Sequence, residues 1–64
     1  MMTEQRQREV EELAQGMLLQ SASITPDGLA ERAGINWFLA RDILQGLAKK
    51  GLLRGLPNGH FSRR

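Results

Sequence analysis

The residues best suited to chemistry lie close together in the segment INWFLARDILQGLAKK, residues 35–50. Arg41 and Gln45 are four residues apart, a spacing that places two side chains on the same side of a helix. An arginine can form two hydrogen bonds with guanine, and a glutamine can do the same with adenine. Phe38 can touch a thymine methyl group, while Asp42 can accept a hydrogen bond from cytosine but repels phosphate. These side chains favour contact with nucleic acid.

Catalysis has little support elsewhere in the sequence. His60 is the only histidine, and the chain has no cysteine and no tyrosine. The serines lie in a loop or near the C-terminus with no evident base beside them, and the glycines do not form a phosphate-binding loop. A single histidine without cysteines or clustered carboxylates does not make a metal site. We therefore expect no enzyme activity, no metal, no cofactor and no small-molecule ligand.

Charge is distributed unevenly along the chain. Residues 1–32 contain three cations and six carboxylates, whereas residues 33–64 contain six cations and one carboxylate. A small domain polarised in this way is typical of a protein whose basic half meets a polyanion. The alternative is a solvated charged surface with a basic tail.

The length of 64 residues predicts one small domain with a thin core. No apolar run reaches the roughly 18 residues of a membrane span, and the polar start does not resemble a signal peptide. The absence of cysteine fits a reducing compartment. We therefore expect a cytoplasmic chain without a membrane partner.

Spacing and capping signals predict three helices. The first spans about residues 4–20, is capped by Thr3 and carries an apolar stripe that begins at Val10. A loop or one short extended step follows at "SASIT". The second helix, about residues 26–33, starts after Thr25 and ends at Gly34. The third, about residues 37–50, is capped by Asn36 and buries a stripe made by Ala40, Ile43, Leu44 and Leu47.

A β-hairpin is expected after the third helix, over about residues 52–62. Asn58-Gly59 is a turn signal because both residues tolerate positive φ. The strands would be residues 52–56 and 60–62. The sequence therefore predicts a fold that is mainly α with a small β-hairpin.

The segment LAERAGINWFLARDIL resembles the middle of a winged helix-turn-helix domain of the bacterial type. Ala30 is small enough for the next helix to approach, Gly34 makes the turn, and Ile35 plugs the joint between the helices. The resemblance covers residues 10–61. Similar bacterial members include repressors of the multiple-antibiotic-resistance type and the terminal DNA-reading domain of chromosome-segregation translocases. It implies three helices plus a wing, and a role in transcription regulation or DNA maintenance.

The same resemblance implies which residues would meet double-stranded DNA. The third helix would enter the major groove with Trp37, Phe38, Arg41 and Gln45 at reading positions. Arg54, His60, Arg63 and Arg64 would form a wing that straddles phosphates, unless this end is a disordered basic tail or the start of a linker. Lys49 is either a phosphate contact or a simple partner of the helix dipole. A domain this small would need a homodimer or a larger parent chain for useful affinity.

Trp37, Phe38 and Leu39 form a run of large apolar residues where family members often carry smaller polar residues or arginine. Each helical residue turns the chain by about 100°, so these three side chains cannot all enter one core. Phe38 is the one most clearly directed outward. The aromatic residues can read bases, can anchor a protein contact on the same fold, or can simply complete a thin core.

Overall fold

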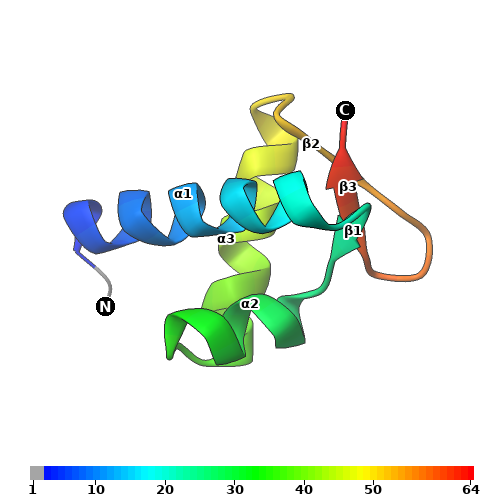
Figure 1. Cartoon of the computed structure of the whole chain (residues 1–64). Coiled ribbons are helices and arrows are strands. Elements are labelled where there is room, and N and C mark those ends of the chain that lie inside the picture. The colour runs from blue at the N-terminus through cyan, green and yellow to red at the C-terminus, as the bar shows by residue number, and fades with distance from the viewer. Residues whose placement is uncertain (1–2) are drawn as a thin grey trace.

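Across residues 3–64, which the computed structural model describes, the chain is mainly helical with a small antiparallel sheet. In Figure 1, α1 and α3 cross, α2 lies beside the N-terminal half of α3, and the sheet lies near the C-terminal end of α1. The elements in chain order are α1 (Glu4–Gln20), β1 (Ser23–Ile24), α2 (Pro26–Ala33), α3 (Trp37–Lys49), β2 (Leu53–Gly55) and β3 (Phe61–Arg63).

The three predicted N-caps are confirmed. Thr3, Thr25 and Asn36 each have an extended backbone, and each side-chain oxygen accepts a hydrogen bond from the backbone N–H three residues later. The distances are 3.1, 3.0 and 2.8 Å respectively. These bonds satisfy donors that the first helical turn leaves free, so the start of each helix is fixed locally.

A tight turn joins α2 to α3. Gly34 has a φ of 69°, a left-handed conformation that L side chains rarely adopt. Its N–H and that of Ile35 both donate to the Ala30 carbonyl, at 2.9 and 3.1 Å. The Arg6 side chain donates to the Ala33 carbonyl, which links the start of α1 to the end of α2. The turn therefore sets α3 relative to the other two helices.

The core fixes the rotation of α3. The predicted inward stripe of this helix is buried, with Leu44 and Leu47 wholly inaccessible to solvent. Side chains from every other element complete the core, and the largest contributions come from Val10, Leu18, Ile24, Leu29, Leu53 and Phe61. Because α1 packs on the side of α3 that carries Leu44 and Leu47, the opposite side of α3 faces solvent.

The sheet has the order β1-β3-β2, so its central strand comes last in the sequence. Ile24 pairs with Phe61, and Leu53 pairs with Arg63, in antiparallel register. The short extended step expected near Ile24 is thus a strand, and its pairing with the C-terminal segment was not predicted. Helix α3 ends one residue earlier than predicted, and the second hairpin strand continues one residue further, to Arg63.

The turn of the hairpin differs from the predicted two-residue Asn58-Gly59 turn. Gly59 has a φ of 85°, but no non-glycine residue of the described chain has positive φ, so Asn58 does not adopt the required conformation. The Leu56 N–H donates to the His60 carbonyl at 2.8 Å, which leaves residues 57–59 as a three-residue loop. Pro57 explains the difference, because its fixed negative φ suits the first loop position and it has no N–H for the ladder.

Candidate nucleic-acid interface

The exposed side of α3 carries the residues that the sequence singled out. Phe38 is 70% exposed and Trp37 is 39% exposed, whereas Leu39 is half-buried. Arg41, Gln45 and Lys49 are also exposed, and their spacing of four residues aligns them along one side of the helix. Leu39 is therefore the bulky residue of this run that turns inward, and Phe38 is the one that turns outward, as predicted.

Trp37 contacts both Phe38 and Arg41 through its side chain. The rings of Trp37 and Phe38 meet edge to face, with centroids 5.3 Å apart and planes at 87°. The guanidinium carbon of Arg41 lies 5.6 Å from the centroid of the Trp37 ring. This is the geometry of a cation–π contact, which restrains the arginine while its N–H groups stay free to donate. We call Trp37 and Phe38 the aromatic pair.

A groove runs between α3 and the hairpin. Helix α3 contributes Trp37, Arg41 and Gln45 to its wall. The hairpin contributes Gly55 and Gly59, which have no side chains to block the groove, and the other lining residues are Pro26, Leu56 and Phe61. The two elements thus form one continuous surface. On it, the guanidinium group of Arg41 and the amide group of Gln45 lie across the groove from the backbone of Gly55 and Gly59.

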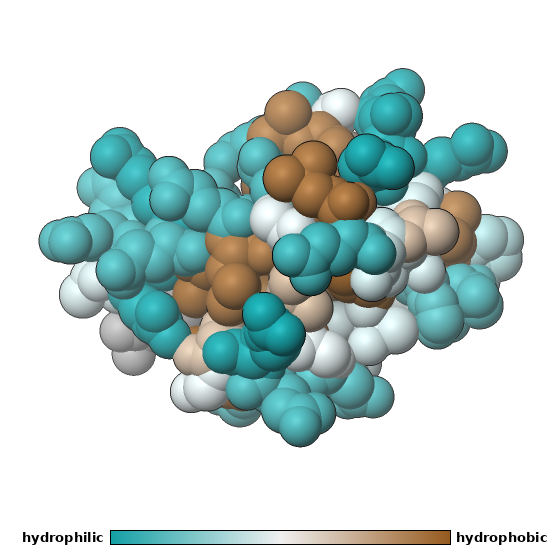
Figure 2. All heavy atoms as spheres, in the orientation of Figure 1, coloured by the Kyte–Doolittle hydropathy of each residue, from teal (hydrophilic) through white to brown (hydrophobic). Residues whose placement is uncertain are grey.

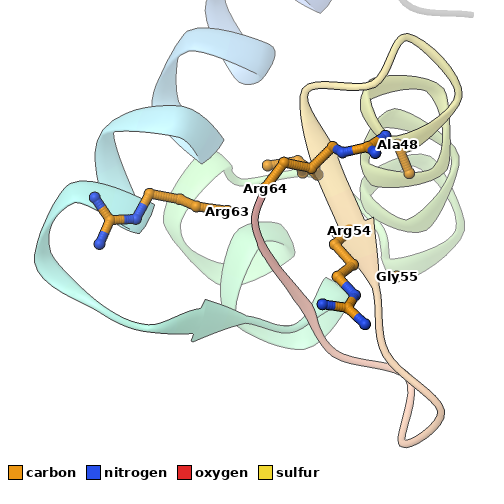
Figure 3. A pocket seen from close by; sticks show the side chains of 6 residues that line it. Ala48, Arg54, Gly55, Arg63 and Arg64 are labelled. Carbon is orange, nitrogen blue, oxygen red and sulfur yellow. The ribbon is translucent and has the colours of Figure 1, made fainter.

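The basic residues of the hairpin do not share one face. Arg54 pairs with Ser62 while Arg63 pairs with Leu53, so Arg54 and Arg63 extend from opposite faces of the sheet. Figure 3 shows Arg64 extending toward Ala48 of α3, and Arg63 pointing away from both Arg54 and Arg64. Arg54, Arg63 and Arg64 all line one depression beside Ala48, but the strand register directs the Arg63 side chain to the other face of the sheet, which the sequence did not predict.

His60 is not brought into this surface by any observed contact. Its side chain is half-buried, its backbone carbonyl accepts from Leu56, and its N–H donates to Oδ1 of Asn58 at 3.1 Å. These backbone bonds give His60 a clear part in shaping the turn. It is not among the residues that line the groove.

Ion pairs occur chiefly on the acidic helix. Arg8 pairs with Glu4 at 3.6 Å, and Lys50 of the α3 C-terminus pairs with Glu11 of α1 at 3.5 Å. Arg6 and Glu9 form a further pair on α1. Within residues 3–64, no salt bridge involves the cations of α3 and the hairpin that remain, namely Arg41, Lys49, Arg54, Arg63 and Arg64. Lys50 is therefore directed toward α1, whereas Lys49 is free to meet an anion.

An apolar patch lies at the C-terminal end of α1, and it was not predicted from the sequence. Leu19 is 76% exposed and Leu52 is 51% exposed, and both line a shallow depression that also includes Arg63. Figure 2 shows apolar side chains gathered over this end of α1 and the loop before β2. The sequence feature that could have predicted this patch is that Leu19 falls outside the buried stripe of its helix.

The structure adds two observations on other kinds of site. Residues 3–64 contain no group of three histidine, cysteine or acidic side chains placed to hold a metal ion. Over the same residues, every helix is too short or too polar to cross a bilayer.

Comparison with known proteins identifies no relative: no family model, no curated protein and no solved structure matches this chain. The geometry of α3 and the hairpin therefore carries the functional argument.

Proposed function

We propose that this chain is a DNA-binding module of the winged helix-turn-helix type, with α2 and α3 as the helix-turn-helix and the β2–β3 hairpin as the wing. The observation that carries the proposal is the groove in which Arg41 and Gln45 of α3 face the hairpin. Two donor-bearing side chains of this kind, four residues apart on an exposed helix, suit the base edges of a major groove.

In this proposal each exposed residue has a defined role. Arg41 contacts guanine, Gln45 contacts adenine, and Phe38 touches a thymine methyl group. Lys49, Arg54 and Arg64 contact phosphates and fix the position of the helix without reading sequence. Arg63 and His60 contribute less, because the Arg63 side chain points away from Arg54 and Arg64 and His60 is half-buried.

The distribution of charge supports one orientation on DNA. Helix α1 carries exposed carboxylates and packs on the side of α3 opposite Phe38. Of the six cations without a salt bridge in the described chain, five lie on α3 and the hairpin, and the sixth, Arg32, lies on α2. A polyanion is therefore attracted to the surface formed by α3 and the hairpin and repelled from α1. A module this small needs a homodimer or a larger parent chain to bind tightly, and regulation of transcription or DNA maintenance is the process that it would serve.

A second candidate function is protein binding through the aromatic pair. Tryptophan and phenylalanine are frequent anchors of protein interfaces, and Phe38 exposes most of its ring. In this case the same fold would present Trp37 and Phe38 to an apolar pocket of a partner. Salt separates the two functions, because counterion release makes DNA binding fall steeply with salt, whereas an apolar contact does not weaken in this way.

The test is an NMR titration of the labelled chain with duplex DNA at about 50 and about 200 mM salt. We expect shifts in the N-terminal half of α3 and in the hairpin, and binding that weakens strongly at the higher salt. The variant Arg41→Ala should lose about 1–3 kcal/mol of binding free energy at a preferred site. Arg8→Ala removes the same charge from α1 and is the matched control, since Arg8 lies away from the proposed surface.

Two results would contradict DNA reading by α3. One is binding that Arg41→Ala and Arg8→Ala weaken equally. The other is unchanged DNA binding in Arg41→Ala together with loss of self-association or partner binding in Phe38→Ala, which sedimentation would detect. The second result would favour the protein-binding function.

A further inference from the structure

Phe38 is held in place and yet left exposed. Its ring meets the Trp37 ring edge to face, and Arg41 in turn lies over the Trp37 ring. Trp37 thus restrains Phe38 directly and is itself restrained by Arg41, while 70% of the Phe38 surface remains open to solvent. An aromatic ring that is already restrained loses little conformational freedom when a ligand covers it. The arrangement is suited to receiving a flat apolar surface.

An intact DNA duplex offers no such surface in its grooves. The bases present their edges there, and the thymine methyl group is the apolar group of the major groove. A methyl group covers only a small part of a phenyl ring. A base that is unpaired and displaced from the stack presents a full aromatic face, and every base can stack in this way.

The surroundings of the aromatic pair favour a nucleotide over an apolar protein surface. Arg41 lies over the Trp37 ring, and Gln45 and Lys49 follow it along the same exposed side of α3, so polar and cationic groups extend from the two rings along the helix. An interface anchor is normally surrounded by further contacts that exclude water, whereas Trp37 of this pair lines the open groove that Gly55 and Gly59 also line. A base on Phe38 would place its own phosphate within the region that these donors border.

We propose that this surface prefers DNA containing an unpaired base, and that the base stacks on Phe38. Trp37 and Arg41 act as positioning residues that hold the ring. The inference rests on the DNA-binding function proposed above and specifies its substrate class. Stacking of one base on an aromatic side chain strengthens binding by roughly 5- to 160-fold.

The test uses Trp37, the only tryptophan in the chain, as a fluorescent reporter next to Phe38. A short paired duplex is compared with the same duplex carrying one unpaired adenine, and with the corresponding single strand. We expect the duplex with the unpaired adenine to bind about 10-fold more tightly than the paired duplex and to quench Trp37 more strongly. Affinity is measured independently by the anisotropy of a dye on the DNA.

Phe38→Leu is the decisive variant, because it keeps an apolar side chain and removes the aromatic face. It should abolish the preference for the unpaired adenine, so that affinity for the duplex with the unpaired adenine falls about 10-fold further than affinity for the paired duplex, in which leucine can still touch the thymine methyl group. Leu19→Ala, which changes an exposed apolar residue on α1, is the matched control and should retain the preference. Circular dichroism confirms that both variants are folded.

The outcomes separate this inference from the function on which it rests. Equal affinity of the unchanged protein for both duplexes overturns the stacking inference and leaves DNA binding intact. A preference that survives in Phe38→Leu overturns the role of Phe38. Absence of binding to every DNA at low salt overturns both proposals, and loss of self-association in Phe38→Leu would then assign the aromatic pair to a protein contact.

Discussion

Replacing Arg54 and Arg64 together by glutamine should make DNA binding less sensitive to salt. Both arginines are exposed, and neither forms a salt bridge within residues 3–64. Arg64 extends toward α3, and Arg63 points away from both Arg54 and Arg64 (Figure 3). Glutamine keeps much of the side-chain length and polarity and removes the positive charge. The double variant therefore tests the phosphate contacts assigned to this side of the hairpin.

The expected size follows from counterion release. Each phosphate contact contributes about 0.9 to the slope of log affinity against log salt, so the loss of two contacts should lower the slope by about 1.8. When salt rises from about 50 to about 200 mM, the unchanged protein should thus lose about 12-fold more affinity than the double variant. The reduction should be similar for different DNA sequences, because phosphate contacts carry no sequence information.

The assay is fluorescence anisotropy with labelled duplex DNA at several salt concentrations. The matched control is Arg8→Gln with Arg63→Gln, which removes the same total charge from α1 and from the face of the hairpin opposite Arg54. The control should change the slope much less than the variant at Arg54 and Arg64. Equal slopes in the two double variants would refute the assignment of the phosphate contacts to Arg54 and Arg64. The salt dependence would then reflect only the net charge of the protein.

Four further predictions concern stability. Leu44→Ala should lower the free energy of unfolding by about 2–5 kcal/mol, because this side chain is wholly buried; a thermal melt like that of the parent would show that α3 is rotated from the position described. Arg6→Leu should cost about 1.5 kcal/mol in a urea titration, since it removes the charged donor from the carbonyl at the end of α2, and no change would mean that this bond does not hold the helices together. Gly46→Ala should raise the melting temperature by adding up to about 1 kcal/mol of stability, because an added Cβ has open space within the helix. A loss of stability in Gly46→Ala would contradict the helix-propensity argument. Gly34→Ala should instead lower the free energy of unfolding by about 1–2 kcal/mol, because Gly34 has a φ of 69°.

The helices were predictable because their signals are local. Thr3, Thr25 and Asn36 act on backbone groups three residues away, and the apolar stripes repeat within each helix. The rotation of α3 followed from the same stripe, which is why the exposure of Phe38 could be inferred before the structure was known. At the candidate interface, the residues that α3 contributes could therefore be predicted from the sequence.

The features that the sequence did not predict depend on contacts between distant segments. Ile24 lies in a strand of two residues, too short to show an alternating pattern, and its partner Phe61 comes from the other end of the chain. The direction of Arg63 depends on strand register, and a shift of one residue would reverse it. The pairing of Lys50 with Glu11 likewise requires α1 and α3 to be packed first. For the hairpin turn, the local signal of Asn58-Gly59 gave way to the fixed φ of Pro57.

The central position of the last strand has a consequence for synthesis of the protein. Strands β1 and β2 form their ladder hydrogen bonds only with β3, and β3 is the last of the three strands to leave the ribosome. The three helices can form earlier, but Ile24 and Leu53 lack the covering strand until residues 61–63 emerge. A nascent chain halted before Phe61 would therefore expose two strand edges and part of the core, which are the features that proteases and chaperones recognise. The order of the strands thus couples completion of the fold to completion of translation through this segment.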